Sequence, residues 1–247
     1  MKKALSLLYG VICYLAFFGT ILYAIGFVGN LFVPKSIDGP PQVALSTAIL
    51  INASLLLLFA VQHSVMARPA FKRWWTSIVP EHLERSTFVL LASLCLMLMM
   101  WQWQPIGGIV WSVENEGAKN ILLVLYVTGW AIVFASTFLI NHFDLFGLRQ
   151  VWLYATGSHY SQLPFRTPML YRVVRHPLYL GFIIAFWSTP LMTAAHLLFA
   201  LLTTGYILTA IQLEERDLSN SFGERYTSYR KLVPMILPFT KKRAARK

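Results

Sequence analysis

Long stretches of apolar residues without a single charge dominate this chain. Four of them are long enough to cross the roughly 30 Å hydrocarbon core of a membrane, which requires about 20 helical residues. They cover residues 5–33, 43–66, 86–103 and 121–140. We therefore predict four membrane-spanning helices in this part of the chain.

A fifth uncharged stretch lies between Arg175 and Glu214 and is too long for one crossing. Its 38 residues would measure about 57 Å as a straight helix, nearly twice the thickness of the bilayer core. Pro190 lies near the middle of the stretch, and proline interrupts helices. We predict a tight helical hairpin with arms over 178–189 and 194–213. We count both arms as spans, which gives six; the alternative is a shorter re-entrant first arm, which gives five.

Composition agrees with a membrane protein. Hydrophobic residues make up 57% of the chain and charged residues 13%, about half the charged share of a soluble domain. This excludes a disordered chain and argues against a soluble globular one. The net charge of +11 would suit a nucleic-acid binder if it formed a soluble basic face, but the cations flank the apolar runs. No nucleic-acid partner is expected.

The basic residues also predict the orientation of the chain. If the N-terminus is cytoplasmic and the hairpin returns to its own side, 19 of the 21 Lys and Arg residues are cytoplasmic. That distribution follows the positive-inside rule. We expect a multi-pass protein of the bacterial inner membrane with both termini in the cytoplasm. The basic segment KKRAARK at 241–247 is expected to contact anionic membrane lipid, with a specific partner as the alternative.

The predicted fold is thus an all-α, polytopic bundle of membrane helices. It has five to six spans, a C-terminal helical hairpin and a cytoplasmic amphipathic tail helix. We divide it into a four-span bundle over 1–140 and a segment over 141–247 that holds a loop, the hairpin and the tail. The two parts are expected to form one integrated domain.

Polar and ionisable residues near membrane depth are costly and therefore point to function. They gather in three places on the predicted cytoplasmic side, namely Gln62-His63, Asn141-His142-Phe143-Asp144, and Arg175-His176 with Glu214-Glu215. Because a hairpin returns to the side it left, His176 and Glu214 are expected to be neighbours in space. An amphipathic helix with Leu218, Phe222, Tyr226 and Tyr229 on one face could close over this pocket.

Each of these features also has a plain structural interpretation. Arg175-His176-Pro177 could simply begin a helix, since proline is favoured in a first turn. Glu214-Glu215 could be a solvated helix end, and the aromatic face could serve packing alone. Cys13 and Cys95 lie inside apolar runs as small hydrophobic residues, and their spacing indicates neither a disulfide framework nor a metal site.

Taken together, the motifs of residues 155–240 resemble the isoprenylcysteine carboxyl methyltransferase superfamily. The first half reads Tyr171-x3-Arg175-His176-Pro177-x-Tyr179-x-Gly181, and the second begins with Glu214-Glu215 and continues through Gly223, Tyr226, Tyr229, Pro234 and Pro238. In the N-terminal half, Gln62-His63-Ser64 and the segment from Asn141 to Gln150 are similar to the NnrU-type branch of that superfamily.

This resemblance implies a site for S-adenosylmethionine (SAM) at the cytoplasmic face. The residues it assigns to SAM are Tyr171, Arg175, His176, Pro177, Tyr179, Gly181, Glu214, Glu215 and Tyr226. It implies S-methylation of a small thiol, with methanethiol to dimethyl sulfide as the expected reaction. The prenylcysteine enzymes carry an arginine one turn before the first glutamate, where this chain has Ala210. A small neutral thiol therefore suits the chain better than an acceptor with a carboxylate.

Methyl transfer to sulfur is helped by a base, because a thiolate is the better nucleophile. His142 is the first candidate, oriented by Asp144 or Asn141, and His63 is the second. The alternative is that His142 and Asp144 merely terminate the fourth span.

Three other functions stay open from the sequence. One is a methyltransferase acting on another thiol, a selenol or a protein cysteine. Another is an NADPH-dependent reductase, because membrane sterol reductases resemble the C-terminal fold. The third is a non-enzymatic protein of nitrogen-oxide metabolism that holds a noncovalent haem through His63, His142 or His159.

Overall fold

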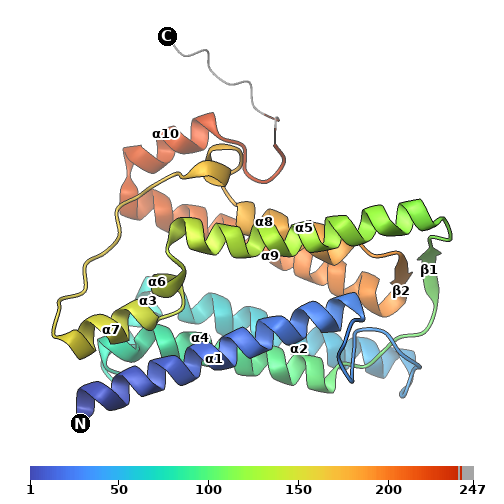
Figure 1. Ribbon diagram of the computed structural model, residues 1–247, viewed down its shortest axis with the longest axis horizontal. Coiled ribbons are helices and arrows are strands. Elements are labelled where there is room, and N and C mark those ends of the chain that lie inside the picture. Colours follow the sequence, from blue (N-terminus) through green and yellow to red (C-terminus); the bar gives the residue numbers. More distant parts are fainter. Residues whose placement is uncertain (239, 241–247) are drawn as a thin grey trace. The chain divides into compact units, whose positions relative to one another are not determined.

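The computed structural model describes residues 1–238 and 240, and nearly all regular structure in them is helical (Figure 1). Within these residues, five helices are long and apolar enough to span a membrane. They are α1 (Lys2–Gly29), α2 (Leu45–Met66), α4 (Glu81–Gln102), α5 (Glu116–Ile140) and α9 (Ala194–Phe222). The predicted all-α polytopic fold is confirmed. The basic segment at 241–247, expected to contact lipid, lies outside the described residues.

Shorter elements connect the long helices. They are the helices α3 (Pro69–Trp75), α6 (His142–Leu145), α7 (Leu148–Thr156), α8 (Pro177–Trp187) and α10 (Glu224–Leu232), the 3-10 helix η1 (Met169–Arg172), and the strands β1 (Ile109–Ser112) and β2 (Leu191–Thr193). The two strands pair in a small sheet.

The predicted hairpin has two arms of unequal length. α8 contains 11 residues, about 16 Å of helix, and is too short to cross the bilayer core. α9 contains 29 residues, about 43 Å, and continues beyond the predicted end at 213. It ends before Gly223, whose positive φ of 55° interrupts the helical conformation between α9 and α10. These lengths fit five spans and a shorter first arm, which was the second of the two span counts.

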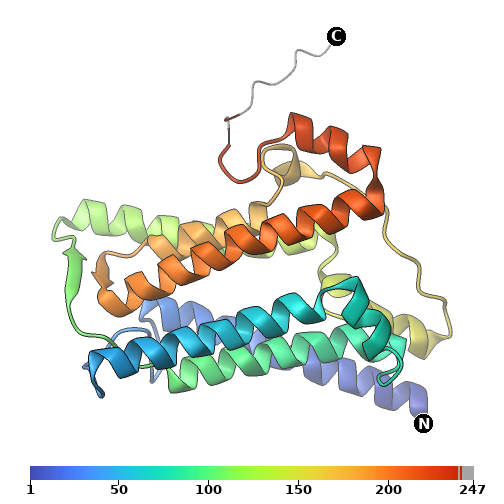
Figure 2. The same ribbon diagram turned by 180° about the vertical axis from the view of Figure 1, so that it is seen from behind.

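The chain folds into two compact units, and each is described by itself. The first comprises residues 1–111, 141–162 and 192–198. In this unit α1, α2 and α4 lie side by side, and α7 packs against α1 and α4 (Figures 1 and 2). Its apolar core joins α2 to α4 through Met66 and Phe88.

The second unit comprises residues 112–140, 163–191 and the chain from 199 onward. Its helices α5 and α8 approach each other closely because two glycines meet at their crossing. A Cβ atom on Gly129 would lie 2.7 Å from the carbonyl oxygen of Gly181, and one on Gly181 would lie 2.6 Å from that of Gly129. Small residues allow such backbone approach between membrane helices. The crossing fixes the position of α8, which carries part of the candidate site.

Candidate active site

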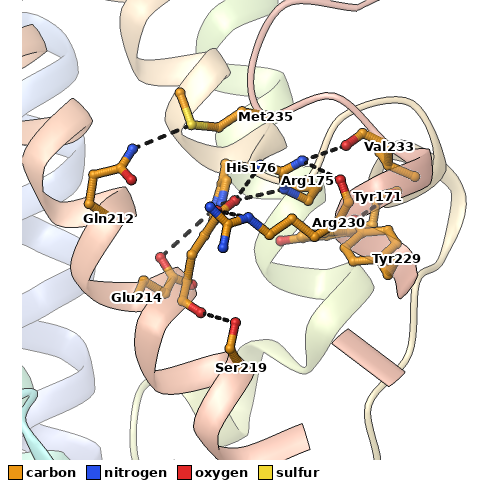
Figure 3. A network of polar contacts seen from close by, with 11 residues as sticks. Tyr171, Arg175, His176, Gln212, Glu214, Ser219, Tyr229, Arg230, Val233 and Met235 are labelled. Carbon is orange, nitrogen blue, oxygen red and sulfur yellow. Dashed lines mark hydrogen bonds and ion pairs between the residues drawn. The ribbon is translucent and has the colours of Figure 1, made fainter. Parts of the chain in front are cut away.

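The two halves of the C-terminal motif meet in the second unit, as the predicted hairpin requires (Figure 3). Nε and Nη2 of Arg175, just before α8, lie 2.7 and 2.6 Å from the carboxylate oxygen Oε1 of Glu215 on α9. Both side chains are buried, with exposed fractions of 6% and 3%. A buried ion pair persists only when its other polar atoms are also satisfied.

Neighbouring groups satisfy this pair. Nη1 of Arg175 donates to the carbonyl oxygens of Arg230 and Val233, at 3.0 and 2.5 Å. On the carboxylate, Oε1 lies 3.1 Å from Nε2 of His176, and Oε2 lies 3.0 Å from Nε of Arg230. All three guanidinium nitrogens of Arg175 thus have partners within the protein. Arg175 and Glu215 form a charged frame around which the rest of the site is built.

Backbone hydrogen bonds hold this frame in place. The chain after α10 runs back along the start of α8, where the N–H groups of Arg175 and His176 donate to the carbonyls of Pro234 and Met235, at 2.9 and 3.1 Å. Pro177 then occupies the first turn of α8, where a helix has no use for its missing N–H. The Arg-His-Pro motif is therefore both a helix start and a part of the cluster.

Two polar groups of the cluster keep hydrogen-bonding capacity. The Glu214 side chain is 42% exposed, and its Oε2 lies 3.9 Å from Nδ1 of His176, beyond hydrogen-bonding distance. Tyr226 is only 1% exposed, yet its hydroxyl has no hydrogen-bond partner among the described residues. A buried hydroxyl without a partner is costly. A bound ligand with a polar group at this place would remove that cost.

Three tyrosines border the cluster. The hydroxyl of Tyr229 donates to the carbonyl oxygen of Tyr171 at 2.5 Å, and the hydroxyl of Tyr171 lies 3.4 Å from the carbonyl oxygen of Ser136. Burial raises the pKa of Tyr171, Tyr226 and Tyr229, so all three phenols are neutral at physiological pH. The ring of Phe165 lies 5.8 and 5.5 Å from the rings of Tyr226 and Tyr229. Neutral aromatic rings therefore wall one side of the site.

Two residues of the site, Arg230 and Phe165, were not predicted from the sequence. Arg230 directly follows Tyr229 of the aromatic pattern, so a search for a cation near the two glutamates could have found it. Phe165 lies in an irregular segment without periodicity, and no signal in the sequence marks it.

The other residues assigned to SAM shape α8. Tyr179 packs against Ile207 and Ile211 of α9, and its ring lies 5.7 Å from that of His176. Gly181 permits the close crossing with α5, and the buried Pro177 begins the helix. These three residues shape the helix that carries the site. Among them, only Tyr179 has a polar group, its hydroxyl.

In the first unit, the predicted catalytic residues Asn141, His142 and Asp144 lie together at α6. Oδ1 of Asn141 accepts a hydrogen bond from the backbone N–H of Asp144 at 3.1 Å and so caps α6. The Asp144 carboxylate pairs with Arg149 at 2.8 Å. These contacts give Asn141 and Asp144 local structural roles at α6 and α7.

His142 has a different partner. Its side chain is almost fully buried, and Nε2 lies 2.8 Å from the hydroxyl oxygen of Tyr14 on α1. Burial lowers the pKa of His142 below its usual value, so the ring is neutral near pH 7 and able to accept a proton. Tyr14 was not predicted, because a tyrosine in a membrane helix is common and carries no functional signal by itself.

His63, the second candidate base, lies elsewhere in the first unit. Its ring lies 5.3 Å from that of Phe59 and 5.0 Å from that of Phe88. Its Nδ1 is buried and has no hydrogen-bond partner among the described residues. His63 therefore sits among apolar rings, whereas His142 is hydrogen-bonded.

A groove of about 470 Å³ in the first unit runs beside α6. It is lined by Leu7, Val11, Asn141, Phe143, Leu148, Arg149 and Trp152. The ring of Phe143 lies 6.3 Å from that of Tyr14 and 5.4 Å from that of His142. Since the cation of Arg149 is paired with Asp144, the groove is apolar with no net charge at its lining.

Comparison with known proteins agrees with the resemblance seen in the motifs. The family model described as NnrU protein matches residues 50–217. A methanethiol S-methyltransferase of Crocosphaera subtropica is 55% identical over 99% of this chain and 96% of its own length. One of Mycobacterium tuberculosis is 52% identical over 97% of this chain and 98% of its own length.

A more distant relative is the mouse protein Nurim, 34% identical over 66% of this chain and 65% of its own length. No solved structure matches the chain. The family model covers more than half of the chain, and the bacterial relatives align over nearly all of it. The chain therefore belongs to the NnrU family.

Proposed function

We propose that this protein methylates methanethiol to dimethyl sulfide, with SAM as the methyl donor, at the cytoplasmic face of the membrane. The observation that carries the proposal is the near full-length similarity, at 52–55% identity, to proteins named methanethiol S-methyltransferase. The charged frame of Arg175 and Glu215 supports it, since both halves of the implied SAM motif converge there. The placement of 19 of 21 basic residues on one predicted side supports the cytoplasmic orientation.

The groups in the second unit fit SAM by their chemistry. The exposed carboxylate of Glu214 suits the ribose hydroxyls or the ammonium group of SAM. The Tyr226 hydroxyl, buried without a partner among the described residues, can bond a polar atom of the same ligand. The neutral faces of Tyr171 and Tyr229 suit a sulfonium cation. Arg175 and Glu215 hold these groups in place, and the half-exposed Arg230 side chain suits the carboxylate of SAM.

SAM, when bound, supplies a methyl group on a positively charged sulfur. The chain has to position the acceptor thiol, remove its proton and exclude water. We assign proton removal to His142, whose neutral ring can take the thiol proton. His63 is the second candidate, because its buried Nδ1 lacks a partner among the described residues.

The acceptor we propose is small and uncharged. No positive charge occurs between Arg175 and Glu214, and Ala210 stands where a carboxylate-binding arginine would be expected. Arg149, the one cation lining the groove beside α6, is neutralised by Asp144. These features disfavour a thiol that carries a carboxylate and favour a thiol that enters apolar surroundings.

The test is headspace gas chromatography of the detergent-purified protein supplied with SAM and methanethiol. We expect dimethyl sulfide from the wild type and its loss in Glu214→Gln, which removes a charge without a large change in shape. Glu224→Gln, an exposed glutamate of α10, is the matched control and should retain activity.

The other outcomes separate the alternatives. Stabilisation of the protein by SAM without product would keep the donor and overturn methanethiol as the acceptor. Stabilisation by NADPH instead of SAM would indicate a reductase, and a Soret band in the purified protein would indicate a haem protein. Either result would overturn the proposal.

A further inference from the structure

Tyr14 lies in the first half of α1 and is distant in sequence from every predicted functional motif. Its hydroxyl oxygen is 2.8 Å from Nε2 of His142, which is 128 positions away along the chain. The two rings meet edge to face, with centroids 5.7 Å apart and an interplanar angle of 81°. Both residues belong to the first compact unit.

The groups first expected to orient His142 have other partners. The carboxylate of Asp144 bonds to Arg149 at 2.8 Å, and its Oδ1 also lies 3.4 Å from Nε2 of Gln150. The amide oxygen of Asn141 accepts the backbone N–H of Asp144. Tyr14 therefore takes the place at the imidazole that the sequence had assigned to Asp144 or Asn141.

Packing alone does not require the Tyr14 hydroxyl. The ring of Tyr14 lies 6.1–6.3 Å from the rings of Phe17, Phe18 and Phe143. A phenylalanine would make the same ring contacts. A phenol in an apolar helix needs a hydrogen-bond partner, because water is absent there. Here that partner is a titratable ring.

We propose that Tyr14 is a positioning residue for thiol methylation, whose hydroxyl fixes the ring of His142 and stabilises it once it carries the thiol proton. This inference rests on the proposed function and on His142 as its base. The protonated imidazole has N–H donors at both nitrogens, so Nε2–H then donates to the Tyr14 oxygen. In a nearly fully buried ring, that acceptor offsets part of the cost of the new charge.

The chemical step balances without any further reactant. The S–H bond of the thiol breaks, and its proton forms an N–H bond on His142. A sulfur electron pair of the resulting thiolate forms the new S–CH3 bond, while the bond from that methyl group to the donor sulfonium breaks and its electrons remain on the departing sulfur. His142 later returns its proton to solvent. The O–H bond of Tyr14 stays intact throughout.

The charged groups near this pair come from three elements. Asp144 of α6 and Arg149 of α7 neutralise each other. Arg85 of α4 donates from Nε to the carbonyl oxygen of Leu145 at 2.6 Å. Loss of the Tyr14 hydroxyl leaves these three groups in place, so a change in the titration of His142 would report on Tyr14 itself.

The test compares Tyr14→Phe with Tyr9→Phe in the full-length protein. Both variants remove one phenol hydroxyl from α1, but that of Tyr9 bonds to Thr87 at 3.0 Å and not to a base. We expect Tyr14→Phe to lower kcat about tenfold with an unchanged KM for SAM, a smaller loss than removal of a general base. The acid limb of its pH–rate profile should move to lower pH, because the protonated ring has lost its acceptor. Tyr9→Phe should change neither quantity.

A double-mutant cycle with His142→Gln separates positioning from packing. If Tyr14 acts through His142, Tyr14→Phe adds no further loss of kcat in the His142→Gln background. Multiplying losses, or an unchanged pH–rate profile in Tyr14→Phe, would overturn the inference. Nitrogen-15 shifts of His142 in the wild type provide a readout independent of the variants, and a ring without a hydrogen bond at Nε2 would also overturn it. Wild type that makes no dimethyl sulfide would overturn the proposed function instead.

Discussion

The two compact units handle polar groups inside a membrane protein in opposite ways. In the second unit, Arg175, Glu215 and Arg230 form a charged cluster in which each ion is held by another. In the first unit, the proposed base His142 is neutral and lies against the hydroxyl of Tyr14 among aromatic rings. In the first arrangement every charge has a partner, which favours one fixed geometry. The second leaves a ring that can change its protonation state.

Removing a charge from the cluster should disturb the second unit most. Glu215→Ala should abolish activity and lower the free energy of unfolding by about 3–5 kcal/mol, because Arg175 would be left buried without its partner. Thermal unfolding followed by circular dichroism and the headspace assay measure both effects. Glu214→Ala, its exposed neighbour, should lose activity at nearly wild-type stability. Equal stability of the two variants would contradict the frame assigned to Arg175 and Glu215.

The corresponding change in the first unit should affect turnover and leave binding intact. His142→Gln should lower kcat about a hundredfold, the lower range for loss of a general base. SAM affinity, measured by thermal shift or calorimetry, should stay at the wild-type value, because His142 is not among the residues proposed to bind SAM. A large fall in SAM affinity would contradict the assignment of His142 to proton removal alone. His63→Gln serves as the test of the second candidate base.

The neutral state of His142 also predicts a pH dependence. Burial lowers the pKa of His142 below its usual value of 6.5, so its proton-accepting form persists to more acidic pH. The acid limb of kcat should therefore have its midpoint below pH 6.5. Between the lowered pKa and 6.5 the unfolded chain binds more protons than the folded one, so this contribution to stability is lost as the pH falls. As the pH is lowered from 7 to 5, the melting temperature of the wild type should therefore fall more than that of His142→Gln.

The smallest effect concerns the buried hydroxyl of Tyr226. Tyr226→Phe removes a polar atom that has no partner among the described residues, so the protein without ligand should be unchanged or slightly more stable. If the hydroxyl bonds SAM, the affinity for SAM should fall by roughly fivefold, the worth of about one hydrogen bond. A variant with unchanged affinity would remove Tyr226 from the SAM site.

Much of the architecture could be predicted from the pattern of apolar runs. The uncharged runs mark the first four spans because length and lack of charge decide membrane crossing. The hairpin also follows from the sequence, since the run after Arg175 is too long for one span and contains Pro190. The arms were predicted with unequal lengths, over 178–189 and 194–213. The extension of the second arm to Phe222 was not predicted, because the end of an apolar run does not mark where a helix continues beyond the membrane.

The candidate site was predictable to a different degree in the two units. Opposite charges separated by a hairpin indicate each other, so Arg175 and His176 with Glu214 and Glu215 form a recognisable set. The contact of Tyr14 with His142 depends on how α1 packs against α6, and a single neutral hydroxyl in an apolar run gives no sequence signal for it. Asp144 illustrates the same limit. Its carboxylate was expected to orient His142, but it pairs with Arg149 of α7 instead.

α9 continues without interruption from its apolar, membrane-spanning part to the candidate site. One uninterrupted helix crosses the bilayer and also carries both glutamates, with Glu214 about 30 Å along the axis from Ala194. No loop interrupts the helix between Ala194 and the two glutamates of the candidate site. The length of this helix therefore sets how far the carboxylates stand from the lipid tails. We expect that distance to change with bilayer thickness, because a helix tilts to match the thickness of the bilayer. We therefore expect lipid chain length to influence how deeply the candidate site is immersed.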